Sequence, residues 1–289
     1  MALLSLSGDE QRILFTQLCN VLEPGVAVAL SSVSHELREP TLALLQQLRA
    51  DHEAAAALCR KMGLWSCKEL REAKEVKLWE DKGLSSDDFA TLGTLGSVLP
   101  ALERLDLSEP EAGADGVQRL AEGLGAGALA AVADFQLFNM NVGDAGASAL
   151  AAALGRGALP RLKILMVNNA AIGDAGLVAL APALRRRPAL EYLNLACNLF
   201  GDEGLAALVA PPPPAAGAPP STGGLAKLKM LILSGTQVTD AGCAALAAAL
   251  DSGALPALPR LLLDGIPASA AAKAAVGEAR ARLRSSAPS

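Results

Sequence analysis

The side chains most often used for metal binding and acid–base chemistry are few in this chain of 289 residues, and they are scattered. It has two histidines, His35 and His52, and five cysteines, none of which forms a C-x-x-C pair. No spacing among them is typical of a metal site. Asp51, His52 and Glu53 are adjacent, but they fall in a stretch with helical spacing, where consecutive side chains point in different directions. We therefore interpret this triplet as part of a solvated helix face, and we predict no metal or cofactor site.

Motifs for phosphate binding or nucleophilic catalysis are absent as well. The chain contains no G-x-x-x-x-G-K-[S/T] loop and no G-x-S-x-G elbow. The glycine cluster 123–127 ends with glycines at the same repeat positions as Gly155 and Gly157, which makes it a repeat turn rather than a phosphate loop. Cys197 and Cys243 also occupy repeat positions, and we expect both to be buried structural thiols. The sequence therefore predicts a protein that is not an enzyme.

Composition and charge narrow the range of partners and compartments. The net charge of −5, from 25 basic and 30 acidic residues, argues against a nucleic-acid binder. No run of 18 or more apolar residues is free of charge and proline, so we expect no membrane partner. The first ten residues lack a basic region, which argues against a signal peptide, and five cysteines without a pairing pattern are typical of a reducing compartment. We expect a cytoplasmic or nuclear protein.

A repeat of about thirty residues organises the C-terminal two thirds of the chain. The pattern L-x-x-L-x-L, with other apolar residues at a few of its positions, begins at Leu102, Val132, Leu162, Leu190, Leu228 and, more weakly, Leu258. The successive spacings are 30, 30, 28, 38 and 30 residues, and the longest contains the proline-rich stretch 211–224. Side chains that alternate in this way are typical of a strand with one packed face.

A second motif, G-D-x-G, starts eleven residues after the beginning of most of these segments. It occurs at 143–146, 173–176 and 201–204, with a close variant at 239–242, and an apolar pattern at helical spacing follows each copy. We expect the aspartate to cap the helix that follows it by accepting hydrogen bonds from that helix's unpaired backbone N–H groups. Each unit is thus predicted to be a strand, a capped turn and a helix, stable only when stacked on its neighbours.

These motifs resemble the leucine-rich repeats of the ribonuclease-inhibitor type over roughly residues 102–270. The resemblance implies an α/β fold, a horseshoe-shaped solenoid with a parallel β-sheet on its concave side and helices on its convex side. The asparagine that the family carries at the ninth repeat position occurs here only as Asn198. We interpret residues 73–100 as a degenerate opening unit, and Ala268–Arg284 as a closing helix.

The N-terminal part of the chain is predicted to be a small all-α module. An amphipathic helix capped near Ser7, a break at Pro24, and a longer helix from Thr41 to about Met62 are predicted there. We therefore predict a helical module over 1–72, a solenoid over 73–284 with the insertion 211–224, and a flexible tail over 285–289.

The start of this module is similar to an F-box, although Ser7 and Gly8 stand where that family usually carries proline. The residues that match the family's apolar positions and its proline are Leu6, Ile13, Leu18, Pro24, Leu30 and Val33. The resemblance implies that these residues bind the adaptor subunit of a cullin-type ubiquitin ligase. The alternative interpretation is that the module is a helical cap for the solenoid.

The predicted concave face carries the candidate binding residues. The third and fifth positions of each segment point away from the packed side of the strand, and the positions that follow extend the exposed edge. The candidates are Asp134, Gln136, Phe138, Ile164, Met166, Asn168, Tyr192, Asn194, Met230 and Ile232. The middle of this set is apolar, and a contiguous exposed apolar patch is unusual on a monomer unless it binds something. The alternative is that a loop of the same chain covers it.

We therefore predict a protein–protein interaction module that binds a protein partner on its concave face. If the F-box resemblance holds, it implies a substrate receptor of a cullin-type ubiquitin ligase. The alternative from another class is a regulator of a small GTPase, because the Ran-activating GTPase-activator family uses the same type of repeat.

Overall fold

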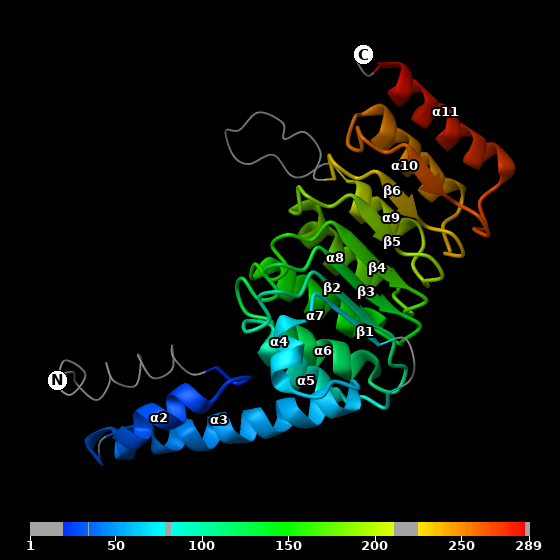
Figure 1. Ribbon diagram of the computed structural model, residues 1–289. Coiled ribbons are helices and arrows are strands. Elements are labelled where there is room, and N and C mark those ends of the chain that lie inside the picture. Colours follow the sequence, from blue (N-terminus) through cyan, green and yellow to red (C-terminus); the bar gives the residue numbers. More distant parts are fainter. Residues whose placement is uncertain (1–19, 34, 79–81, 211–224, 287–289) are drawn as a thin grey trace.

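The computed structural model describes residues 20–33, 35–78, 82–210 and 225–286, and its fold is an α/β solenoid (Figure 1). The helices are α2 Gly25–Val33, α3 His35–Lys61, α4 Cys67–Glu72, α5 Ser86–Leu95, α6 Gly113–Gly123, α7 Gly143–Gly155, α8 Asp174–Arg185, α9 Asp202–Val209, α10 Asp240–Asp251 and α11 Ala270–Ser286. The strands are β1 Glu75–Leu78, β2 Arg104–Leu107, β3 Asp134–Phe138, β4 Ile164–Asn168, β5 Tyr192–Asn194, β6 Met230–Ile232 and β7 Arg260–Leu262. From β1 onward, strands and helices alternate along the chain.

The strands lie side by side in one parallel sheet, in chain order from β1 to β7 (Figure 1). Their register does not shift, so Leu105 pairs with Phe135, Phe135 with Leu165, and Leu165 with Leu193. These residues hold the fourth position of successive segments, and the sequence repeat therefore becomes a straight column of side chains across the sheet. β1 joins in the same register, with Val76 beside Leu105, as expected for an opening unit.

The hydrophobic core fills the space between the sheet and the helices on its convex side. The columns at the fourth and sixth positions of the segments are almost entirely buried, and leucines and alanines of α5 to α10 pack against them. Phe89, Phe135 and Phe200 are the largest fully buried side chains. Because each unit packs on the next, the core is continuous along the array, as a stacked solenoid requires.

The aspartates of the G-D-x-G turns cap helices, but not the helices that were predicted. Asp174 and Asp202 are the first residues of their own helices, where the N-cap positions are held by Gly173 and Gly201. Each aspartate instead accepts hydrogen bonds from the turn of the next unit. The donors are the N–H groups of Gly173 and Gly176 to Asp144, Gly201 and Gly204 to Asp174, and Thr239 and Gly242 to Asp202, at 2.7 to 2.9 Å.

This arrangement explains both the aspartate and the last glycine of the motif. A carboxylate at one helix start stabilises the positive end of the neighbouring helix dipole, which ties each unit to the next. Burial alone would raise the pKa of Asp202, but the hydrogen bonds from Thr239 and Gly242 outweigh it and lower the pKa. At 113–116 the second and third positions are exchanged, so Ala114 stands where the bridging aspartate would be and the bridge is missing from that unit.

Replacing Gly242 with alanine should destabilise the protein by about 1 to 3 kcal/mol, although alanine normally favours a helix over glycine. A Cβ atom at this position would lie 2.8 Å from Cγ1 of Val238 and still nearer to Oδ1 of Asp202, whose hydrogen bonds fix it in place. Gly277→Ala is the matched control, because a Cβ there has no neighbour within 4 Å, and it should be neutral or stabilising. Urea denaturation followed by circular dichroism measures both, and equal effects of the two changes would contradict the close packing inferred here.

At the opposite helix ends, arginines serve the same purpose as the aspartates. Arg156 donates to the carbonyl oxygens of Ala121 and Leu124 at the end of α6, at 2.7 and 3.2 Å. Arg187 donates to the carbonyl oxygen of Leu154 in α7 and to those of Ala158 and Leu159 in the turn that follows it. Arg185 donates to the carbonyl oxygens of Ala207 and Ala210 at the end of α9. A cation at the C-terminal end of a helix offsets its dipole. The cluster Arg185–Arg187 therefore joins neighbouring units and does more than make a helix end polar.

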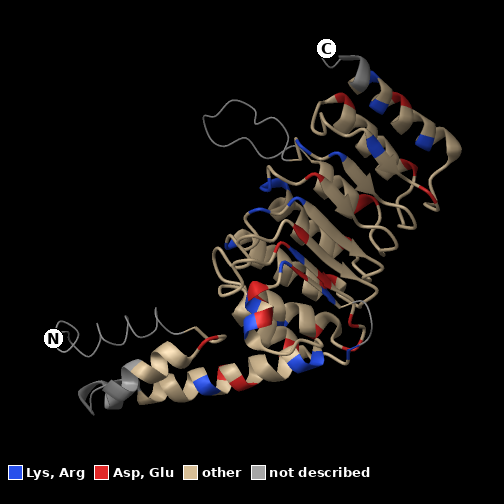
Figure 2. Cartoon of the chain, viewed as in Figure 1, with Lys and Arg blue, Asp and Glu red and all other residues tan. Residues whose placement is uncertain are grey.

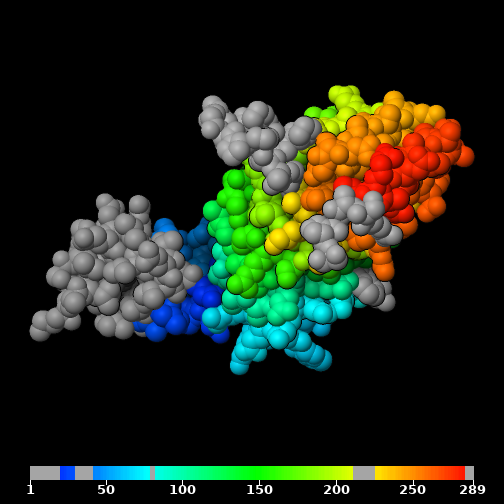
Figure 3. Space-filling model, turned by 90° about the horizontal axis from the view of Figure 1, so that it is seen from above, coloured from blue at the N-terminus to red at the C-terminus, as the bar shows by residue number. Residues whose placement is uncertain are grey.

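Helices α2 and α3 form a hairpin at the β1 end of the repeat array (Figure 1), and their blue atoms lie to one side of the repeats in Figure 3. Ala27, Leu45 and Leu48 form a small cluster of their own between α2 and α3, whereas Leu58 belongs to the main core. The prediction that the long helix starts at Thr41 is wrong, because α3 begins at His35 and continues through Pro40. A proline near a helix start removes one backbone hydrogen bond, and the later turns continue without it.

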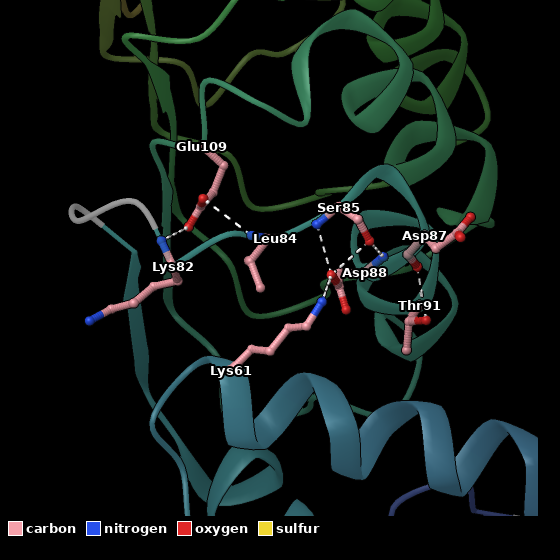
Figure 4. Close-up of polar contacts among 8 residues, drawn as sticks. All are labelled: Lys61, Lys82, Leu84, Ser85, Asp87, Asp88, Thr91 and Glu109. Atoms are coloured by element: carbon pink, nitrogen blue, oxygen red, sulfur yellow. Dashed lines mark hydrogen bonds and ion pairs between the residues drawn. The ribbon is translucent and has the colours of Figure 1, made fainter.

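The end of α3 is fastened to the opening repeat by a small polar network (Figure 4). Nζ of Lys61 donates to Oδ2 of Asp88 at 2.5 Å, and Asp88 also forms a capping box with Ser85 at the start of α5. Burial by itself would raise the pKa of Asp88, but the hydrogen bonds from Lys61 and Ser85 lower it. Beside this network, the buried carboxylate of Glu109 accepts hydrogen bonds from the backbone N–H groups of Lys82 and Leu84 (Figure 4).

The ninth and eighth repeat positions shape the edge where the strands end. Asn198 is buried, and its amide donates to the carbonyls of Val167 and Leu195 and accepts from Ile172, which joins two units. The eighth position has left-handed backbone in successive units, at Asn139, Asn169, Cys197, Gly235 and Gly265. Asparagine and glycine tolerate this conformation, so most units carry them there.

Candidate functional site

The concave face consists of two rows of side chains in strict register. The first row holds the third position of each segment, and it runs Glu75, Arg104, Asp134, Ile164, Tyr192, Met230, Arg260. The second row holds the fifth position, and it runs Lys77, Asp106, Gln136, Met166, Asn194, Ile232, Leu262. Both rows are charged over the first strands, and over β4 to β6 the first row becomes apolar, whereas the second row places Asn194 between Met166 and Ile232. The predicted candidates on the strands therefore lie together on one surface.

These side chains are more buried than the sequence predicted. Gln136 and Asn194 are only 7% and 8% exposed, while Ile164, Met166 and Tyr192 are half-buried rather than fully exposed. Both side chains are flanked within the second row, Gln136 by Asp106 and Met166, and Asn194 by Met166 and Ile232. Phe138 and Asn168 extend the surface at the far ends of β3 and β4, and both are half-buried.

The charges at the β2 end of the face neutralise one another. Arg104 donates from Nε to both carboxylate oxygens of Asp106 at 2.9 and 3.0 Å, and its Nη1 lies 3.3 Å from Asp134. Burial raises the pKa of Asp134, despite the hydrogen bond from Gln136 and the positive charge of Arg104. This end of the face is therefore a closed ion network, with few charges left for a partner.

The apolar middle of the face contains a pocket of about 410 Å³. It is lined by Ile164, Glu191, Tyr192, Lys229, Met230, Pro259 and Arg260, and we call it the Tyr192 pocket. Burial raises the pKa of Tyr192, and the negative charge of Asp134 adds to this effect. The pocket combines an apolar floor with charged groups at its rim, as ligand sites commonly do.

Four residues of this pocket were not among the predicted site residues. Glu191, Lys229 and Pro259 directly precede the third position of their segments, and Arg260 holds the third position of the last segment. The prediction was restricted to outward-pointing positions of the stronger repeats. The signal that could have found Arg260 is its register with Tyr192 and Met230.

Cys59, Cys67, Cys243 and His52 lie on helices and not on this face. Cys59, Cys67 and Cys243 are buried, and burial raises the pKa of Cys59 to about 12, so its thiol stays protonated. The prediction that Cys197 is buried is wrong, because it holds the left-handed eighth position at the exposed strand edge. His52 is half-buried rather than solvated, with Nδ1 2.7 Å from the carbonyl oxygen of Val21, and it ties α3 to the segment before α2.

The predicted adaptor-binding residues are only partly within the described ranges. Leu6, Ile13 and Leu18 lie outside them. Leu30 and Val33 lie in the second half of α2, and Pro24 directly precedes that helix. Among the helices in the described ranges, none combines the length and the apolarity needed to cross a bilayer. Within the same ranges, no three His, Cys, Asp or Glu side chains converge as ligands for a metal ion.

Comparison with known proteins identifies the repeat. A family model described as "Leucine Rich repeat" matches residues 160–181, 188–209 and 224–247. The chain matches no curated protein. Similar solved structures include leiomodin-1 actin-binding site 2, at 16% identity and a TM-score of 0.39, with 69% of this chain and 89% of that chain covered. An internalin from Listeria monocytogenes is also 16% identical, at a TM-score of 0.35, with 64% and 48% covered. The matched repeats, and the parallel sheet that they build, make this chain a leucine-rich repeat protein.

Proposed function

We propose that the chain is a non-catalytic interaction protein that holds a protein partner on the concave face of its repeat array. The observation that carries the proposal is the apolar block in the two rows. Ile164, Tyr192 and Met230 are neighbours in the first row, and Met166 and Ile232 stand beside them in the second. Each of these side chains is half-buried.

The physical argument starts from the two faces of the sheet. Parallel sheets are normally covered on both faces, because their strands carry apolar side chains on both. Here the convex face is covered by helices, whereas the apolar block on the concave face keeps part of its surface exposed. Apolar surface gathered in this way is typical of an interaction site, and tyrosine and methionine are favoured at the centre of such sites. A bound partner would cover the concave face of the sheet, as the helices cover its convex face.

The test is affinity capture from a cell extract with the full-length chain and two variants, followed by mass spectrometry. Tyr192→Glu places a charge in the apolar block, and Val178→Glu places the same charge on the convex side, where Val178 is 38% exposed. We expect a set of proteins that Tyr192→Glu loses and Val178→Glu keeps. If every captured protein is kept by both variants, the concave face is not the binding surface.

The narrower role, a substrate receptor of a cullin-type ubiquitin ligase, is supported by the F-box resemblance of residues 6–38. It would place the chain in the cytoplasm or the nucleus. We expect the full-length chain to co-elute with the purified adaptor subunit in size-exclusion chromatography, and Ile13→Glu to abolish co-elution. Separate elution of the wild-type chain and the adaptor would exclude this role and leave partner binding on the concave face untouched.

The alternative role, activation of a small GTPase, is supported by the repeat type alone. Its test is the rate of GTP hydrolysis by the Ran GTPase with and without the chain. An increase of several orders of magnitude is the signature of a GTPase activator. An unchanged rate would exclude it.

A further inference from the structure

The rim of the Tyr192 pocket carries an excess of positive charge. Lys229 and Arg260 line the pocket together with a single carboxylate, that of Glu191. The hydrogen bond from Lys229 lowers the pKa of Glu191, and the positive charges of Lys163 and Lys227 add to this effect. The backbone N–H of Glu191 donates to the carbonyl oxygen of Lys163 at 2.8 Å, so Lys163 lies beside Glu191. Figure 2 shows basic residues of the middle and C-terminal repeats along the edge where the strands begin.

Of the two cations that line the pocket, Lys229 and Arg260, the arginine is the one still available. Glu191 is already engaged, because its Oε2 accepts from Nζ of Lys229 at 2.7 Å. Arg260 is exposed, and in the described part of the chain no carboxylate pairs with its guanidinium. Arg104, at the other end of the same row, is bound by Asp106 and Asp134. One arginine of the row is thus neutralised internally, and the other faces the pocket with its charge uncompensated.

We propose that the Tyr192 pocket receives a large apolar side chain from an acidic protein segment, and that Arg260 pairs with a carboxylate adjacent to that side chain. This inference rests on the function proposed above, since it names the chemistry of the partner on the concave face. The planar guanidinium offers two parallel N–H donors that match the geometry of a carboxylate. A basic segment would instead meet like charges from Lys229 and Arg260, which disfavours it.

The charged groups at the two ends of the pocket also set the orientation in which the partner segment binds. Asp134 stands next to Ile164 on the β3 side of the pocket, and Arg260 stands next to Met230 on the β7 side. An acidic residue of the partner finds no available cation at the first end, where Arg104 is bound by Asp106 and Asp134, and it is attracted at the second end. The carboxylate therefore lies toward β7, with the apolar side chain over Tyr192.

The experiment selects random peptides displayed on phage against the full-length chain. The selected peptides are synthesised, and their affinities are measured by fluorescence polarisation for wild type, Arg260→Glu and Arg186→Glu. Arg186 is the control, because it is exposed at the end of α8 and lies outside the pocket. We expect selected peptides to carry Asp or Glu beside Leu, Ile, Phe, Met or Trp. Arg260→Glu should weaken their binding about tenfold or more, as expected for a lost charge-assisted pair, and Arg186→Glu should leave it unchanged.

A charge swap makes the test specific. Peptides in which the acidic residue is replaced by lysine should bind Arg260→Glu more tightly than they bind wild type. Selected peptides without an acidic residue, or equal binding to wild type and Arg260→Glu, would overturn the proposal. For the natural partner, loss of binding in Tyr192→Glu but not in Arg260→Glu overturns the acidic segment alone, and no loss in either variant overturns the concave site as well.

Discussion

Replacing Leu165 with alanine should lower the free energy of unfolding by about 2 to 5 kcal/mol, the range found when a buried leucine leaves a cavity. Its side chain is 0% exposed and stands in the fourth-position column between Phe135 and Leu193. Because stability in a repeat array depends on the contacts between neighbouring units, the loss should lower the midpoint of the whole unfolding transition. Urea denaturation monitored by circular dichroism measures both the midpoint and the cooperativity.

Leu262→Ala is the matched control for this change. Leu262 occupies the fifth position of the last strand and is 42% exposed, so its truncation should cost less than about 1 kcal/mol. Equal losses in the two variants would contradict the assignment of one strand face to the core. A second, separate transition in Leu165→Ala would contradict a continuous core.

Replacing Met166 with glutamate should weaken binding of the captured partner about a hundredfold or more while the fold is kept. Its half-buried side chain lies between Gln136 and Asn194 at the centre of the face, so a partner seated there would bury the new charge without a counter-ion. In the free protein the charge remains in contact with water, and the stability change should stay within about 1 kcal/mol. Calorimetric titration gives the affinity, and urea denaturation gives the stability.

Val178→Glu is the control, because it adds the same charge on the opposite face of the solenoid. It should change neither the affinity for the partner nor the free energy of unfolding. If Met166→Glu unfolds the protein, the fifth position belongs to the core, and the assignment of the concave face is inverted. If the affinity is unchanged in a folded Met166→Glu variant, the partner sits elsewhere.

The strands and their register follow from the sequence because two periodicities coincide. Side chains alternate along each strand, and the leucine segments recur at nearly constant spacing, so only one pairing buries all the leucines. That is why Leu165 falls between Phe135 and Leu193, and why even the degenerate strand β1 takes its place beside β2. The start of α5 was also predictable, since Ser85 has an aspartate three residues later and forms a capping box with it.

What the sequence could not provide depends on contacts between units. Asp174 caps the helix of the next unit because the turn of that unit lies within hydrogen-bond distance of its carboxylate. The sequence pattern of a single unit does not contain the distance between units. The burial of Gln136 and Asn194 depends on the neighbouring strands, whose second-row side chains flank them on both sides. Arg260 was left out of the site because the last repeat is irregular in sequence, although its strand pairs in the same register as the others.

Site-specific photo-crosslinking tests the central claim most directly. A benzoylphenylalanine in place of Tyr192 stands in the apolar block of the concave face, and one in place of Val178 stands on the convex surface. With the captured partner bound, we predict that irradiation links the partner at position 192 and not at position 178. A crosslink at position 178 alone, or at neither position while the partner remains bound, would contradict a partner held on the concave sheet.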